Sequence, residues 1–420
     1  MLDLKWIREN PELVRKGLEA KGAKVPLDEL LRLDQERRLL LKEVEDLKAR
    51  RNTTNDEITL LKKAGKSVES VISSIKSTSQ KIKEIDDKVG ESSLKIDNIL
   101  YVIPNLPIDS VPIAKGIEGN KIVRTWGELK RFDFTPLDHL QLGSKLGWFS
   151  MELGGKITGA AFPVYLGKGA RLERALINFM IDYHTKHHNY TEVWPPALVN
   201  RQSMTGTGQL PKFEEDMYQL KDDDYFLVPT AEVPLTNLLR DEILEEKNLP
   251  IRFTAYSPCF RREAGSYGKD TRGLSRVHQF DKVELVKFVK PEDSLQELES
   301  LVVNAEAILQ ALELPYRVVL LGSGDMSFAS AKCFDLEVWA SATQKWFEVS
   351  SCSMFGDFQA RRANIRFRRN ETKKLEYVHT LNGSGLALAR IVLCLLENFQ
   401  TPSGEIQFPK ALLPYLSSLA

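Results

Sequence analysis

The chain has 420 residues, more than one domain ordinarily contains, so two domains are expected. Its 58 basic and 58 acidic side chains cancel, which excludes a global positive field as the means of attracting nucleic acid. The four cysteines lack Cys-x-x-Cys spacing, and no apolar run approaches the ~18 residues of a membrane span. We therefore expect a cytoplasmic protein without a membrane segment.

The first part of the chain contains two series of positions spaced alternately four and three residues apart. The first runs from Leu33 to Leu61, and the second includes Val68, Ile72, Ile75, Ser79, Ile82, Asp86 and Val89. Spacing of 3.5 residues keeps one side of a helix against a partner helix, and Gly65 allows the chain to reverse. The pattern predicts an antiparallel coiled-coil arm over about residues 27–98, within a helical domain of residues 1–100.

A plain amphipathic hairpin folded against a globular body is also compatible with this periodicity. The apolar stripe is narrow, however, and the other faces are almost entirely charged. A buried helix would show a wider apolar stripe. These features favour a helical hairpin that projects into solvent.

Residues 101–116 contain three prolines and predict a semi-rigid linker. Over residues 117–420 strand-like and helical runs alternate. Helices are expected near 170–187, 231–246, 292–312 and 383–399, and strands near 193–197, 225–229, 316–321, 335–339 and 346–351. Because hairpin strands follow one another, we expect an α+β domain on an antiparallel sheet.

The run from Phe260 to Glu284, FRREAGSYGKDTRGLSRVHQFDKVE, predicts two antiparallel strands joined by a long glycine-rich loop over 264–273. The strands place an arginine, a glutamate and an aromatic ring on a common surface, which suits an anionic nucleotide. The chain has no GxxxxGK[ST] sequence, so a triphosphate site without a P-loop is indicated. The alternative is an ordinary surface hairpin with solvated charges.

This run resembles the second signature motif of class II aminoacyl-tRNA synthetases, and most closely that of bacterial-type seryl-tRNA synthetases. GARLERALINFMIDYHTKHHNYTEVWPPALVN and HTLNGSGLALARIVLCLLENFQ are similar to the first and third motifs. The motifs occur in the family's order, and the resemblance spans nearly the whole chain. It implies a class II catalytic domain over 117–420, an N-terminal arm that binds tRNA(Ser), and a homodimer with Pro195 and Pro196 at its interface.

The resemblance further implies that L-serine and ATP, with Mg²⁺, form seryl-adenylate, from which serine passes to the 3′-terminal adenosine of tRNA(Ser). It leaves open whether tRNA(Sec) is charged too. The implied ATP-binding residues are Arg261, Arg262, Glu263, Val277, Phe280, Glu348, Val349, Ser350, Ser351 and Arg390; Arg261 and Arg390 are catalytic, and Glu348 and Ser351 hold the metal. The implied serine-binding residues are Thr230, Ala231, Glu232, Arg261, Glu284 and Ser384.

The chemistry of these residue types agrees with such roles. Charge builds on phosphoryl oxygens when a carboxylate attacks the α-phosphorus, and arginine forks stabilise it. A buried carboxylate such as Glu284 rejects an amino acid without a hydroxyl, because the carboxylate would then be left unpaired. Glu348 and Ser351 stand three residues apart on a strand, so one common site requires a bulge or the strand's end.

Several alternatives stay open at this stage. Arg390 could be a helix-buried arginine paired to a carboxylate, and Glu348 an ordinary surface glutamate. Met354 and Ala389 stand where the family commonly has asparagine and glycine, which puts some local hydrogen bonding in doubt. Rival functions are a ligase that loads a carrier protein, and a catalytically silent paralogue acting as a coiled-coil interaction protein. The heptad hairpin argues against the first, and the retained site residues argue against the second.

Overall fold

The computed structural model describes residues 1–263 and 272–417. They form two compact units: one of Asp3–Leu18 with Ala23–Ile103, and one of Met1–Leu2 and Glu19–Gly22 with Pro104–Ala420. Among the described residues, no helix has both the length and the apolar character needed to cross a membrane.

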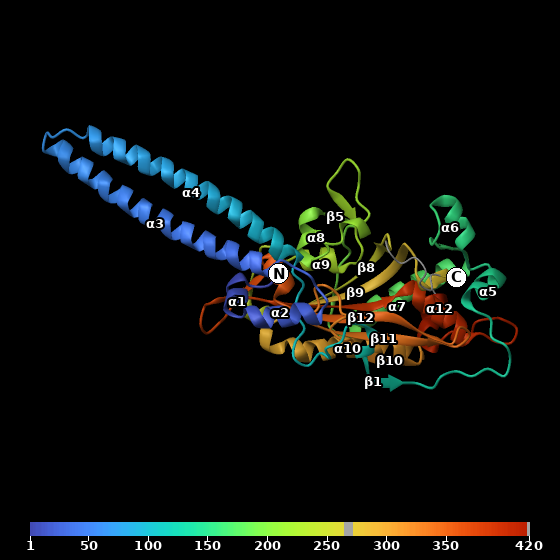
Figure 1. The fold of residues 1–420 in the computed structure, drawn as a ribbon. Coiled ribbons are helices and arrows are strands. Elements are labelled where there is room, and N and C mark those ends of the chain that lie inside the picture. Colours follow the sequence, from blue (N-terminus) through green and yellow to red (C-terminus); the bar gives the residue numbers. More distant parts are fainter. Residues whose placement is uncertain (264–271, 418–420) are drawn as a thin grey trace. The chain divides into compact units, whose positions relative to one another are not determined.

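The first unit is helical. It contains α1 (Leu4–Glu9), most of α2 (Pro11–Ala20), α3 (Leu27–Lys63) and α4 (Glu69–Val102). The helices α3 and α4 run side by side as an antiparallel pair, called the arm below (Figure 1). Gly65 connects them with a φ of +68°, a left-handed conformation that glycine adopts without Cβ strain. The predicted hairpin is therefore confirmed.

The predicted arm seam is right in α3 and half right in α4. In α3, Leu33 and Val44 are buried at their expected positions. In α4, Ile72 is 47% exposed and Asp86 is exposed, whereas Val71 and Ile85 turn inward. The inward series 68, 71, 75, 78, 82, 85 and 89 is also a heptad, with every second position one residue earlier than expected.

The second unit is built on an antiparallel sheet, as expected. Among the described residues, the strands lie in the order β1 (Lys121–Trp126), β10 (Tyr316–Leu320), β11 (Lys332–Ala340), β12 (Lys345–Gly356), β15 (His379–Ala387), β9 (Gln279–Val289), β8 (Ile251–Phe260) and β4 (Thr191–Glu192). Every neighbouring pair is antiparallel except β4 with β8. The strands β8 and β9 are the predicted hairpin, and residues 264–271 of its predicted loop lie outside the described residues.

One large apolar core joins the sheet to three helices. These are α7 (Lys168–His187), α10 (Ser294–Ala311) and α12 (Leu388–Phe399). Along β9 the side chains alternate: Val283 and Leu285 belong to this core, so Lys282 and Glu284 face the opposite side of the sheet. Burial of each such leucine or valine stabilises the fold by about 1.5–3 kcal/mol. The helices thus hold one side of the sheet rigid and leave the other for polar groups.

Shorter elements complete the unit. They are α5 (His139–Leu146), β2 (Phe149–Ser150), α6 (Met151–Ile157), β3 (Val164–Tyr165), β5 (Leu198–Asn200), α8 (Arg201–Thr207), β6 (Tyr225–Leu227), α9 (Glu232–Asn237), β7 (Ile243–Glu245), α11 (Phe358–Ala363), β13 (Arg366–Arg368), β14 (Leu375–Tyr377) and α13 (Leu413–Ser417), with a 3₁₀ turn η4 at Gly273–Ser275.

Three predicted elements are wrong in type or extent. The helix expected over 231–246 ends at Asn237, because the chain turns and β7 pairs with β13. The helix expected over 383–399 begins at Leu388, because residues 379–387 form β15 between β12 and β9. The strand expected over 193–197 is replaced by short strands on either side, since Pro195 and Pro196 have no N–H to donate.

Candidate active site

A cavity of about 590 Å³ opens on the polar side of the sheet. Eleven of the residues expected at the site line it: Thr230, Glu232, Arg261, Glu263, Val277, Phe280, Glu348, Val349, Ser351, Ser384 and Arg390. They come from β9, β12, β15, α9 and α12 and from the segments that flank α9, β8 and β9. Antiparallel pairing therefore gathers residues that lie as much as 160 positions apart in sequence.

Arg261 and Phe280 form one wall of the cavity. Arg261 directly follows β8, its Nε donates to the carbonyl oxygen of Pro229 at 3.3 Å, and its guanidinium lies 5.3 Å from the centre of the Phe280 ring. A cation held beside an aromatic face suits a ligand that has both a planar ring and negative charge. Glu263 nearby accepts from Arg276 Nη1 at 2.5 Å.

Arg390 also lines the cavity and is the third residue of α12, nearer the helix start than the sequence suggested. Its Nε donates to Ser275 O at 3.0 Å, and its Nη1 donates to Glu348 O at 2.6 Å. The Glu348 carboxylate lies 3.5 Å away, and the arginine side chain is only 27% exposed. The guanidinium is thus held by two backbone oxygens and faces the cavity.

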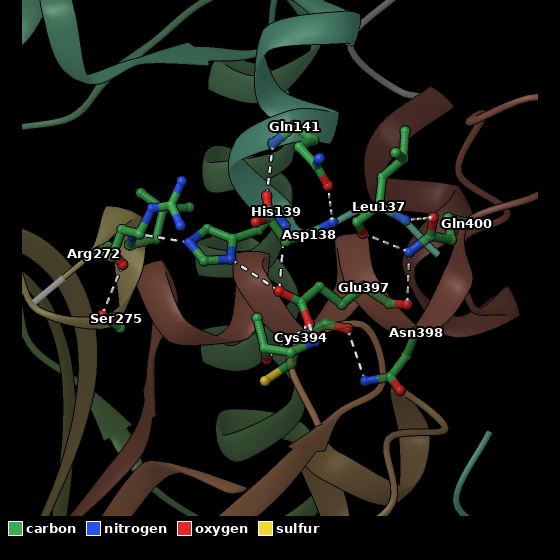
Figure 2. Close-up of polar contacts among 12 residues, drawn as sticks. Leu137, Asp138, His139, Gln141, Arg272, Ser275, Cys394, Glu397, Asn398 and Gln400 are labelled. Atoms are coloured by element: carbon green, nitrogen blue, oxygen red, sulfur yellow. Dashed lines mark hydrogen bonds and ion pairs between the residues drawn. The ribbon is translucent and has the colours of Figure 1, made fainter. Parts of the chain in front are cut away.

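A buried histidine positions the segment that holds Arg390. Figure 2 shows the ring of His139, at the start of α5, in contact with the carboxylate of Glu397 on α12. The distance between His139 Nδ1 and Glu397 Oε1 is 2.9 Å. The Leu274 N–H donates to His139 Nε2 at 3.3 Å, so the ring proton must be on Nδ1. Gly273 has a φ of +67°, and a Cβ there would lie 2.3 Å from His139 Nε2. Only glycine permits this close approach of η4 to α5.

The spacing of Glu348 and Ser351 is explained by a β-bulge. Opposite β11, the register shifts so that Glu337 pairs with Glu348 and Leu336 with Ser350, leaving Val349 as the extra residue. Both Glu348 and Ser351 consequently line the same cavity. Of the two solutions that the sequence allows, a bulge or the end of a strand, the structure has the bulge.

These oxygens fit a magnesium ion. Asp335 lies opposite Ser351 on β11, and burial, then the neighbouring Glu348 charge, raise the pKa of the Asp335 carboxyl well above its usual value. A divalent cation would relieve that repulsion. In the part of the chain that the structure describes, no cluster of three or more His, Cys, Asp or Glu forms a metal site. Mg²⁺ is usually bound by only one or two protein side chains and takes its other ligands from water and phosphate.

Glu284 is the most enclosed acid of the site, with no exposed surface. Its Oε2 accepts from Thr230 Oγ1 at 2.9 Å and pairs with the Lys282 ammonium, while its Oε1 accepts from Asn382 Nδ2 at 3.0 Å. Glu284 itself does not line the cavity, but Thr230, Lys282 and Asn382 do. Glu284 therefore lies directly behind these three side chains, and a ligand that contacts them comes close to its carboxylate.

Glu232 is a second buried acid, at the start of α9. Its carboxylate accepts from Gln359 Nε2 at 2.6 Å and from Asn382 Nδ2 at 3.1 Å. Burial, followed by the charge of Glu284, raises the pKa of Glu232 to about 7. Asn382 thus bridges two carboxylates, and a cationic ligand at Glu232 would stabilise the ionised form.

Known proteins with related sequences settle the family. Residues 212–399 match the model of the tRNA synthetase class II core domain (G, H, P, S and T), and residues 1–107 match that of the seryl-tRNA synthetase N-terminal domain. The serine–tRNA ligase of Desulfitobacterium hafniense (strain Y51) is 55% identical over 416 residues, which cover 99% of each chain. The chain belongs to the seryl-tRNA synthetase family. The activity that follows is ligation of serine to tRNA.

Solved seryl-tRNA synthetases have the same fold. The enzyme of Pyrococcus horikoshii, complexed with ATP, matches with a TM-score of 0.93 at 38% identity, covering 99% of this chain and 98% of that one. The cytoplasmic serine–tRNA ligase of Naegleria fowleri, in complex with AMP, matches with a TM-score of 0.88 at 30% identity, covering 99% and 97%. The expected class II core with its antiparallel sheet and helical arm is confirmed.

Three of the residues implied by the seryl-tRNA synthetase motifs do not line the cavity, besides Glu284. Arg262 is exposed, Ala231 is buried in a neighbouring apolar cluster, and Ser350 is buried with its Oγ donating to Ser384 O at 2.6 Å. Ser350 therefore fixes the strand that carries Ser384. Of the two departures from the family pattern, Met354 packs in the main apolar core and Ala389 lines the cavity.

Sequence reasoning missed three polar residues of the site: Lys282, Gln359 and Asn382. Lys282 lies two residues from both Phe280 and Glu284, so side-chain alternation puts all three on one side of β9. This spacing could have predicted that Lys282 lies at the site. Asn382 opens the NGSG run and directly precedes the helix expected over 383–399, so the sequence does not place it on a strand. Gln359 lies on α11 and no local pattern marks it.

Proposed function

We propose that the chain activates L-serine with ATP in this cavity and then transfers the seryl group to the 3′-terminal adenosine of tRNA(Ser). The observation that carries this proposal is the fully buried Glu284, held by Thr230 and Asn382 beside a cavity flanked by Arg261 and Arg390. The cavity thus combines a carboxylate that can accept a hydrogen bond from a small polar side chain with two cations that can bind phosphate. Each half-reaction uses a different part of the set.

ATP occupies the side of the cavity formed by β8, β9 and α12. Phe280 stacks on adenine, with Val277 beside it, and Glu263 accepts from the adenine amino group. Arg261 and Arg390 neutralise the phosphates, and the backbone at Val349 and Ser350 borders them. A serine carboxylate oxygen forms a bond to the α-phosphorus as the bond to the β-phosphate oxygen breaks, releasing pyrophosphate. The arginines stabilise the charge that builds in this step.

Glu348 and Ser351 would hold Mg²⁺, with the remaining ligands from phosphate and water. When bound, the ion supplies positive charge for the departing pyrophosphate. Glu348 is suited to this because its side chain is 46% exposed and faces Arg390 at 3.5 Å, so it can exchange partners without crossing the core.

Serine occupies the inner end of the cavity. Glu232, with Thr230 and Ala231 before it, binds the ammonium group, and Arg261 reaches the carboxylate. Glu284 accepts a hydrogen bond from the side-chain hydroxyl, and Ser384, opposite Glu284 in the β9–β15 pairing, borders the same space. Alanine would leave Glu284 without its partner, and the penalty for an unpaired buried group excludes it.

We further propose that residues 1–100 bind tRNA(Ser) through the arm, that residues 101–116 link them to the catalytic residues 117–420, and that the protein is a cytoplasmic homodimer. Along the arm, Arg50, Arg51, Lys62 and Lys63 make no ion pair among the described residues, and cations of this kind contact RNA backbone. Support for the dimer comes from Trp194, which is 77% exposed beside Pro195 and Pro196.

Amino-acid-dependent exchange of pyrophosphate into ATP tests the function. Serine should support exchange, whereas threonine, glycine and alanine should each support less than about a hundredth of that rate. Exchange that depends on another amino acid and not on serine would overturn the substrate. If the same preparation supports exchange with serine but does not charge tRNA(Ser), the proposed activation of serine would stand and the proposed transfer to tRNA would be overturned.

A further inference from the structure

Lys282 is a buried lysine in the wall of the serine end of the cavity. It is 5% exposed, lines the cavity, and has no role in the half-reactions described above. Its Nζ donates to Thr230 Oγ1 at 2.9 Å and forms an ion pair with Glu284 Oε2. A lysine is rarely buried without a partner, and here the partner is the residue that reads the substrate side chain.

The hydrogen bonds leave Glu284 one place for a ligand. A carboxylate has about four acceptor sites, two on each oxygen. Oε2 already accepts from Thr230 and Lys282, and Oε1 accepts from Asn382. The remaining acceptor site is therefore on Oε1, and one donor group is the most that it can take.

Charges in this part of the cavity can be counted as well. Glu232 and Glu284 bring two negative charges, and Lys282 brings one positive charge in direct contact with Glu284. The hydrogen bonds of Glu232 come from the neutral amides of Gln359 and Asn382. When Glu232 is ionised, one negative charge, at Glu232, is thus left for a cation, and the α-ammonium group of an amino acid supplies one.

We propose that Lys282 determines the side-chain specificity of the site: its ammonium neutralises Glu284, so that Glu284 accepts from a neutral hydroxyl, and the same ammonium repels a cationic side chain. The inference rests on the proposed serine activation and adds that the ammonium is directed to Glu232. Without Lys282, Glu284 would carry an uncompensated buried charge, and a second cation would satisfy it. The class of ligand excluded by Lys282 is an amino acid of serine's size with an amine in place of the hydroxyl.

L-2,3-Diaminopropionate is that amino acid, and pyrophosphate exchange compares it with serine. The assay is run at about pH 6, where the side-chain amine is protonated, with serine in the same buffer as the reference. The unmodified protein should prefer serine by at least about 100-fold in kcat/KM. In Lys282→Met the preference should shrink by at least about tenfold, because activation of diaminopropionate rises while that of serine falls.

Two variants separate specificity from a merely structural role. Lys287→Met removes another buried lysine of β9, one that pairs with Glu297 at 2.8 Å on the helix-covered side, and should keep the wild-type preference. The double variant Lys282→Met/Glu284→Gln removes both charges and should lose the gain with diaminopropionate. Equal losses for both amino acids in Lys282→Met would show that the lysine only supports the fold, and would overturn the inference.

The unmodified protein provides an independent test if Lys282→Met does not fold. Activation or competitive inhibition by diaminopropionate as strong as by serine would overturn the inference while leaving serine activation intact. Rejection of diaminopropionate by the unmodified protein, together with its acceptance by any folded variant in which only the Lys282 charge is lost, such as Lys282→Gln, supports it. Absence of serine-dependent exchange would instead contradict the proposed function.

Discussion

The arm and the cavity carry their charges in opposite environments. In the arm, Lys48 and Asp86 pair at 3.2 Å with nearly half of each side chain exposed. In the cavity, Lys282 and Glu284 pair with 6% and 0% of their side chains exposed. An exposed pair contributes about 0–1 kcal/mol, whereas removing one partner of a buried pair costs about 3–5 kcal/mol. Single substitutions should therefore be severe in the cavity and mild and additive in the arm.

Loss of a cavity arginine should have the largest effect. Arg261→Ala should lower serine-dependent exchange by about 10³-fold or more, because a cation is removed from the charge that builds on phosphate. Steady-state exchange rates measure this. Arg252→Ala, which removes an arginine of β8 that pairs with Glu297 outside the cavity, should change the rate less than threefold or so. Similar losses in both variants would contradict a specific role for the arginine that lines the cavity.

Loss of the Glu284 charge should have the next largest effect. Glu284→Gln should lower kcat/KM for serine by about 10²-fold and leave the KM for ATP nearly unchanged, because only the serine end of the cavity is altered. The arm supplies the matched carboxylate: Asp86→Asn should leave both parameters unchanged. A tenfold rise in the KM for ATP in Glu284→Gln would contradict the assignment of Glu284 to the serine end of the cavity.

The pH dependence of serine activation should follow Glu232. With a pKa of about 7, Glu232 is protonated in acid, so kcat/KM for serine should rise about tenfold per pH unit up to pH 7 and then level off. A pH profile measures this, and Glu232→Gln should lose the rise along with most of its activity. A wild-type profile that is flat between pH 5.5 and 7 would refute the ammonium role.

The same residue links pH to stability. Its folded pKa is raised above the ordinary 4.5, so Glu232 destabilises the fold progressively as the pH rises from 4.5 to about 7. Glu232→Gln should then increase the free energy of unfolding by about 1–3 kcal/mol at pH 8 and leave it unchanged near pH 4. Urea unfolding at the two pH values separates these cases. A stability gain of the same size at both pH values would mean that charge is not its cause.

Substitutions on the arm should have the smallest effects. Arg50→Ala and Arg51→Ala should each raise the KM for tRNA(Ser) about three- to tenfold and reduce its salt dependence by roughly one counterion. Exchange should be unaffected. Asp56→Asn, an acidic control on the same helix, should leave the KM for tRNA unchanged or slightly lower. An effect of either arginine on exchange would break the separation between the two regions.

The two regions also differ in how far the sequence predicts them. The heptad of α3 is local, so burial of Leu33 and Val44 could be read directly from spacing. In α4 two neighbouring phases were both partly apolar, and only packing against α3 selects Val71 and Ile85 over Ile72 and Asp86. Local periodicity thus identifies the helices, while their mutual contact decides the phase.

The cavity depends on contacts between distant segments. The spacing of Glu348 and Ser351 predicts either a bulge or the end of a strand, because side-chain alternation would otherwise separate them, and the structure has the bulge. The role of Asn382 depends on the pairing of β15 with β9, and the sequence predicts a helix over the second half of that strand, from residue 383 onward. His139 reaches η4 across 135 residues of sequence. Such pairings are set by tertiary packing, which no single-sequence pattern reports.

Shortening the arm tests the division between the regions most directly. Replacing residues 47–83 with a short glycine–serine turn keeps the buried Val44 and Ile85 and removes the distal cations. Serine-dependent exchange and charging of tRNA(Ser) are then measured on the same preparation. We expect exchange within about twofold of the full-length chain and charging reduced by at least about 100-fold. Undiminished charging, or exchange lost in parallel with charging, would contradict the account.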